Sequence, residues 1–552
     1  MVLESYFYTI LSSILLAPIG ILFFKNFPID IILKIFFGIL IAALIASFTS
    51  RFIPSYTREI LLLLSVSSIL IIYIKKIPLI DSFNKNWYVS AISFTLFFIF
   101  SSLFLHDLNP YYYRFEAHDI HIFGPTIEIF NSNYFGNIKN PISFPNELSS
   151  YHTLPGIFIG TASFINPSIN LITLISSKYL LLSFFLASFF SDGFLKVKKK
   201  YMYLFSLITI LYFFKESFYY SLSISSYLYA LILIVLAKLS IKNDRKFLPI
   251  IFCVLVSLTA IKIPIYYAVL PSLVYLLLFL KKSILRIESI LFCYFVFLSL
   301  LGIALIPISD DVSGIVSYSL MNPFILDDLK SLAGIWFVEL RHFSSLMFFL
   351  DHDLTIQILG YPVKDLTQLL IKIIFIIFFY FAFLVFCLRK IEDSIIQKSL
   401  LIYLATSLLG VFFIRNNGNM DLQNHLYFLM PFLIIYYFPF YLAELPSRMN
   451  RTLSCFLLVI ISFNIFDLAL YKPTLAGSSL DYRDTNSIHY SEIDFDFNHS
   501  LKDRYIINKD TPFWYHEINS QLIGKRIYKE DLKKFEIDTK DSFLIKYSIL
   551  EK

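Results

Sequence analysis

The chain has 552 residues, of which 57% are hydrophobic and 16% are charged, and its mean hydropathy is +0.70. Soluble globular proteins average about 25% charged residues, so this composition excludes a soluble enzyme, and the hydrophobic content excludes a disordered chain. The net charge of +6 is modest, and no dense basic run with aromatic residues points to nucleic acid. We therefore expect an all-α polytopic membrane protein.

Apolar runs long enough for spanning helices recur along the whole chain. A spanning helix needs about 20 apolar residues, and we predict about 13 to 15 transmembrane helices. The shorter run 154–165 is predicted to be re-entrant or interfacial, because so short a helix cannot cross. The predicted spans are 5–24, 29–50, 58–75, 88–106, 171–191, 201–214, 218–238, 247–262, 265–280, 288–308, 366–388, 399–414, 426–443 and 452–470.

The basic residues between these spans predict the orientation of the chain. Clusters such as Lys75/Lys76, Lys281/Lys282/Arg286 and Arg389/Lys390 all fall on one side, which we assign to the cytoplasm by the positive-inside rule. The 10 histidines then fall on the outer side or at its edge. We expect a multi-pass protein of the bacterial cytoplasmic membrane, with the N-terminus and the C-terminal tail outside.

This threading divides the chain into four regions. Residues 1–106 form the N-terminal helices, and 107–170 form the first outer loop with its interfacial and re-entrant helices. Residues 171–471 form the transmembrane core, which includes the second outer loop, 309–365. The tail, 472–552, is predicted to be a small α/β module that rests on the outer loops. Its β-like runs are Arg504–Asn508, Arg526–Lys529 and Ser542–Tyr547, and a helix is expected near 516–523.

The first outer loop holds the densest chemistry. Residues 112–123 can form a helix on which His118 and His121 share one face, as do Glu116 and Asp119, because residues three apart are neighbours on a helix. Desolvation near a membrane makes a carboxylate a better proton acceptor, so Asp119 is the first candidate for a catalytic base and Glu116 the second. The alternative is an interfacial helix whose polar residues serve only solvation.

Further candidates for substrate binding lie at the membrane edges of other outer segments. Glu147 and His152 precede the re-entrant run, whose N-terminus would favour a phosphate. Arg341–His342 in the second outer loop could bind a lipid-linked pyrophosphate, since the guanidinium fork matches phosphate oxygens. Arg415 and His425 flank a short polar loop and could touch phosphate, although pairing of Arg415 with Asp421 is an equally open interpretation.

Metal sites and buried charges receive weaker predictions. His118, His121 and neighbouring carboxylates, or Asp351–His352–Asp353, could bind a divalent cation, but no established ligand spacing occurs. We therefore assign no metal ligands and no certain cofactor, and a divalent cation stays an open alternative. Each cysteine lies in an apolar run and is expected to be a small buried hydrophobe. Lysines within or near spans are expected to reach the interface with their ammonium groups: Lys34, Lys178, Lys262 and Lys372.

Three segments resemble the GT-C superfamily of membrane glycosyltransferases. They are FEAHDIHIFGPTIEIFNSNYF (115–135), FPNELSSYHTLPGIFIG (144–160) and NHLYFLMPFLII (424–435). The resemblance implies a polyprenyl-linked sugar donor, a saccharide or lipid acceptor at the outer leaflet, and an acidic base in the first outer loop at Asp119. In familiar members that loop follows the first span, whereas here it follows about four.

The O-antigen and capsule polymerases and ligases are similar in their many spans and their long outer loop with Arg and His. That resemblance would make Arg341–His342 central instead of Asp119. Both readings imply lipid-linked saccharides and membrane lipids as partners. A transporter or flippase for a lipid-linked oligosaccharide is a third alternative, but it predicts polar residues along the spans, whereas here they cluster in the outer loops.

Overall fold

The computed structural model describes the N-terminal helices, a central group of helices and short strands in the second half of the chain. The longer described stretches are residues 2–27, 31–53, 56–78, 153–167, 245–261, 266–284, 286–304 and 395–416. Single residues and short stretches are described elsewhere, among them 126, 129–130, 173–174, 176–178 and 504–507.

The longer helices of this part of the chain overlap predicted spans. They are α1 (Val2–Phe23), α2 (Ile31–Phe52), α3 (Thr57–Ile74), α10 (Leu248–Ile261), α11 (Tyr266–Ile284), α12 (Ile287–Ala304) and α16 (Ile395–Phe413). By length and composition, three of them could cross a membrane: Leu3–Phe23, Ile31–Ser50 and Thr57–Ile74. The protein is therefore largely helical in its described part and is consistent with a membrane protein, while the full number of spans stays a prediction.

Stripes of exposed apolar side chains run along the outward faces of these helices. On α1 they are Leu3, Phe7, Ile10 and Ile14, and on α12 they are Ile287, Ile290, Tyr294 and Phe297. The spacing of three and four residues places each set on one helical face. A soluble monomer rarely exposes so much contiguous apolar surface, so these stripes are the faces that would contact lipid.

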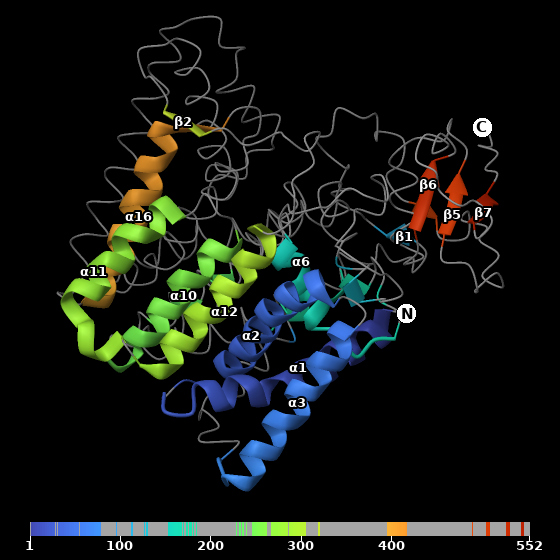
Figure 1. Ribbon diagram of the computed structural model, residues 1–552, viewed down its shortest axis with the longest axis horizontal. Coiled ribbons are helices and arrows are strands. Elements are labelled where there is room, and N and C mark those ends of the chain that lie inside the picture. Colours follow the sequence, from blue (N-terminus) through green and yellow to red (C-terminus); the bar gives the residue numbers. More distant parts are fainter. Residues whose placement is uncertain are drawn as a thin grey trace, which may run out of the picture.

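The α1–α2 hairpin forms the tightest contact between described helices (Figure 1). A Cβ atom added at Gly38 would lie 2.3 Å from the carbonyl oxygen of Leu16, and one added at Gly20 would meet the backbone of Lys34. Glycine is thus required at both positions for the two backbones to approach. Close approach through small residues is a common way for helices to associate in membranes, where apolar side chains gain little by leaving lipid.

A layer of helices covers α2 on its far side from α1. In Figure 1, α2 lies between α1 and α12, and α10 and α11 continue the layer toward α16. Phenylalanine rings fill the junction: Phe37 lies 4.5 Å from Phe24 and 6.4 Å from Phe292, measured between ring centroids. This packing buries most of α2, and Phe36 and Phe37 are fully buried.

The short helix α6 (Thr153–Thr161) lies in the interior of this bundle. Ile157, Phe158 and Ile159 have no exposed surface, and α6 packs against α2 and α10. A turn over 162–165 follows the helix. Whether 154–165 is re-entrant or interfacial stays a prediction, because burial among protein side chains does not give its position in a membrane.

Short strands connect segments that are far apart in the sequence. Strand β1 (Tyr112–Tyr113) pairs with β4 (Ile488–His489), and β2 (Tyr318–Leu320) pairs with β3 (Ile414–Asn416), both antiparallel. The helix predicted over 112–123 is therefore wrong at its first two residues. The two tyrosines there favour an extended backbone, which forms its strand hydrogen bonds with β4. The remainder of that predicted helix lies outside the described residues.

The described residues of the tail contain a parallel sheet. Its strands are β5 (Arg504–Ile507), β6 (Arg526–Lys529) and β7 (Ser542–Ile545), with β5 in the middle. Each strand lies within one of the runs predicted to be β-like. The helix expected near 516–523 lies outside the described residues, so the α/β module as a whole and its outer location stay predictions.

Contacts at the two ends of α1 bring connections from different parts of the chain together. At the C-terminal end, Asn26 Nδ2 donates to Glu288 Oε1 at 3.1 Å, which brings the α1–α2 and α11–α12 connections together. At the N-terminal end, Ser5 Oγ donates to Thr173 Oγ1 at 3.4 Å, and Arg58 Nη1 donates to the carbonyl oxygen of Pro167 at 3.2 Å. The compartment that each end faces stays a prediction.

Candidate functional site

The predicted site residues fall mostly outside the described part of the chain. Arg415 is the exception: it lies in β3, where its backbone pairs with Ser319 of the second outer loop. This register joins the loop after α16 to the segment that contains Arg341 and His342. The positions outside the described residues are Glu116, His118, Asp119, His121, Glu147, His152, Arg341, His342 and His425.

A buried hydroxyl network is the main polar feature of the described helices. Thr9 Oγ1 lies 2.7 Å from Ser177 Oγ and 3.1 Å from Ser163 Oγ, and Ser163 and Ser177 also hydrogen-bond to each other. All three residues are at most 1% exposed. The triangle joins α1, the turn after α6 and the helical residues 176–178.

Further hydrogen bonds extend this network at both ends. Asn166 Nδ2 donates to Thr173 Oγ1 at 3.3 Å, and Thr173 Oγ1 also accepts from Ser5. The backbone N–H of Ile165 donates to Ser12 Oγ at 3.3 Å. The turn that ends α6 is thereby held to α1 by side chains rather than by apolar packing alone.

The sequence spacing explains why these hydroxyls meet. Ser5, Thr9 and Ser12 follow one another at intervals of four and three on α1, and Thr173 and Ser177 are four apart, so each set lies on one helical face. Ser and Thr side chains in membrane helices commonly hydrogen-bond across the helix interface. This spacing was visible in the sequence and was the signal that our sequence analysis missed.

Two lysines of the described residues are buried, contrary to the prediction. Lys178, next in sequence to Ser177, is 1% exposed, and Lys34 on α2 is 4% exposed. Both make interactions within the protein, so the prediction that they extend to the interface is wrong for both. A buried cation within a helix bundle is costly and is commonly associated with function or with a partner in the bundle. Lys262 and Lys372 lie outside the described residues.

Two described residues of the predicted first outer loop, Thr126 and Phe130, contact α6. A Cβ atom added at Gly160 of α6 would lie 2.6 Å from Thr126 Cγ2 and 2.5 Å from the ring of Phe130. Thr126 and Phe130 are themselves buried. The absence of a side chain at Gly160 therefore lets the segment after the predicted acidic cluster dock on α6.

The hydroxyl network can hold helices in position. Hydroxyls and a carboxamide donate and accept hydrogen bonds, and the hydrogen bonds given above join no described carboxylate or imidazole that could act as a general base. Within the described ranges, no group of three or more His, Cys, Asp or Glu residues could hold a metal ion. The network instead fixes α6, whose first residue, Thr153, directly follows the predicted substrate ligand His152.

Comparisons with known proteins identify no relative of this chain. No family model, no curated protein and no solved structure matches the chain.

Proposed function

We propose that the protein is a membrane glycosyltransferase that uses a polyprenyl-linked sugar donor at the outer leaflet in surface polysaccharide or glycoconjugate assembly. The observation that carries the proposal is the concentration of acidic and histidine residues in the first outer loop, at 116–121. Lipid-facing helices suit a donor that arrives laterally through the membrane, because no nucleotide site is then needed. The segment resemblance to the GT-C enzymes supports the same substrate class.

In the proposed reaction, Asp119 removes the proton from the acceptor hydroxyl, which then attacks the anomeric carbon of the donor sugar. Arg341 and Arg415 stabilise the negative charge on the departing carrier phosphate. The backbone pairing of Arg415 with Ser319 supports their cooperation, because it joins the two loops that contain these arginines. The hydroxyl network contributes indirectly by fixing α6, the helix that follows Glu147 and His152.

The test is transfer of a labelled hexose from a polyprenyl-phosphate carrier in proteoliposomes that contain the full chain. Asp119→Asn keeps the size of the side chain and removes the base, so we expect a loss of about 10²- to 10⁴-fold in transfer rate. Arg341→Ala is expected to lose about 10²- to 10³-fold. Glu288→Gln is the matched control, because it also replaces a carboxylate by a carboxamide. Glu288 accepts a hydrogen bond from Asn26, at the opposite end of α1 from the Arg58–Pro167 contact.

The same experiment separates the neighbouring functions. Full transfer activity in Asp119→Asn together with loss in Arg341→Ala would favour an oligosaccharide polymerase or ligase. If wild-type protein moves the labelled lipid across the bilayer without transferring the sugar, a transporter or flippase replaces the proposed transferase.

A further inference from the structure

An arginine in the connection between α11 and α12 is held over an aromatic ring in the connection between α1 and α2. The guanidinium carbon of Arg286, at the start of α12, lies 5.1 Å from the centroid of the Phe27 ring. Phe27 is 3% exposed and therefore provides a rigid surface, whereas Arg286 is exposed. A guanidinium placed over an aromatic face is attracted by the ring and loses little freedom when it binds a ligand.

A second cation lies in the connection between α1 and α2, close in sequence to this ring. Lys25 is exposed and sits two residues before Phe27, and neither Lys25 nor Arg286 makes an ion pair with any described residue. The nearest described carboxylate in sequence, Glu288, accepts the hydrogen bond from Asn26 at 3.1 Å.

An apolar stripe on α12 begins directly after the arginine. Ile287 is 64% exposed, Ile290 is 51% exposed and Tyr294 is 53% exposed. These positions share one face of the helix. A phospholipid whose acyl chains cover this stripe would place its head group beside Arg286.

We propose that Lys25 and Arg286 bind the head group of an anionic phospholipid whose acyl chains lie along α12. The guanidinium fork matches two phosphate oxygens, and the ammonium group adds a second charge. Each basic residue near an anionic membrane surface strengthens binding by about five-fold. The inference does not depend on the proposed transferase activity.

The test is native mass spectrometry of the purified full chain with added phosphatidylglycerol or phosphatidylcholine. We expect wild-type protein to retain phosphatidylglycerol more strongly, and the double variant Lys25→Gln/Arg286→Gln to lose about 25-fold in affinity for it. The matched control is Lys75→Gln/Lys76→Asn, which removes two charges from the tip of α3. Asparagine suits position 76 because the backbone there has φ +48°. This control should bind phosphatidylglycerol like the wild type.

A second variant isolates the ring that holds the arginine. Phe27→Leu keeps an apolar side chain at a buried position but removes the aromatic face, so we expect weaker binding with both charges intact. Equal binding of the two lipids, or wild-type affinity in the Lys25/Arg286 double variant, would overturn the inference. Displacement of the lipid by millimolar inorganic phosphate would overturn it too, because the site would then recognise free phosphate without acyl chains.

Discussion

At the scale of single residues, the clearest constraint is the glycine at position 38. Gly38→Ala adds a Cβ atom 2.3 Å from the Leu16 carbonyl oxygen, so the two backbones must separate. Intrinsic helix propensity alone would make the alanine variant more stable by about 1 kcal/mol. A net loss of stability would therefore come from the steric clash between the two backbones. We expect destabilisation of about 1–3 kcal/mol, measured by thermal or denaturant unfolding in detergent. Leu63→Ala on the exposed face of α3 is the control and should change little.

At the scale of elements, the hydroxyl triangle makes the attachment of α1 to the helical residues 176–178 testable. Thr9→Val keeps the side-chain shape and removes one hydroxyl, and Ser177→Ala removes its partner at 2.7 Å. Interhelical hydrogen bonds in membrane proteins average about 0.6 kcal/mol and reach about 1.7 kcal/mol. We expect a coupling energy in that range from a double-mutant cycle of unfolding free energies.

A buried serine with a purely local hydrogen bond provides the control for this cycle. Ser257 is buried on α10, and its hydroxyl donates to the Val254 carbonyl oxygen of the same helix at 2.7 Å. Thr9→Val combined with Ser257→Ala should show no coupling. A coupling energy near zero for the Thr9–Ser177 pair would mean that this hydrogen bond adds nothing to the packing of α1 against residues 176–178.

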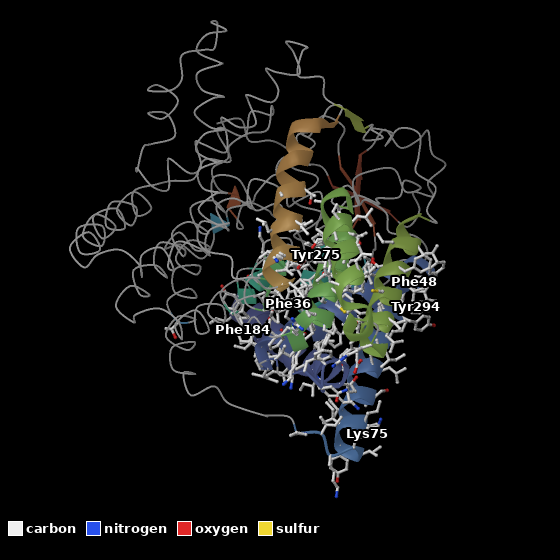
Figure 2. All side chains as sticks on the ribbon, turned by 90° about the vertical axis from the view of Figure 1, so that its left-hand side faces the viewer. Phe36, Phe48, Lys75, Phe184, Tyr275 and Tyr294 are labelled. Atoms are coloured by element: carbon white, nitrogen blue, oxygen red, sulfur yellow. The ribbon has the colours of Figure 1, made fainter. Side chains whose placement is uncertain are left out.

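At the scale of the whole molecule, α3 provides a test of sidedness. Lys75 lies at the free tip of this helix, beyond the other labelled side chains of Figure 2, while Ile53 is exposed before its start. In a cysteine-free background, we expect Ile53→Cys to react with an impermeant maleimide added to intact cells. Lys75→Cys should react only after permeabilisation. The reverse pattern would put the first outer loop in the cytoplasm and contradict the proposed transferase.

The sequence alone determined that the chain is helical and apolar enough for a membrane, and it located the described long helices to within a few residues. Both properties depend on local composition: a continuous apolar run of about 20 residues specifies a span whatever lies beside it. The short runs that contain β5, β6 and β7 were likewise visible as local β-propensity.

Only the tertiary structure decided which helices touch and which polar groups are buried. Residues that are distant in sequence meet in the Gly38–Leu16 contact and in the Thr9–Ser163–Ser177 triangle. The burial of Lys178 reverses the expectation that its ammonium group reaches the interface. An apolar face suits lipid and another helix almost equally well, so hydrophobic pattern alone cannot select a partner in a membrane. The selection comes from small and polar side chains that meet across an interface, and the three-dimensional packing determines where they meet.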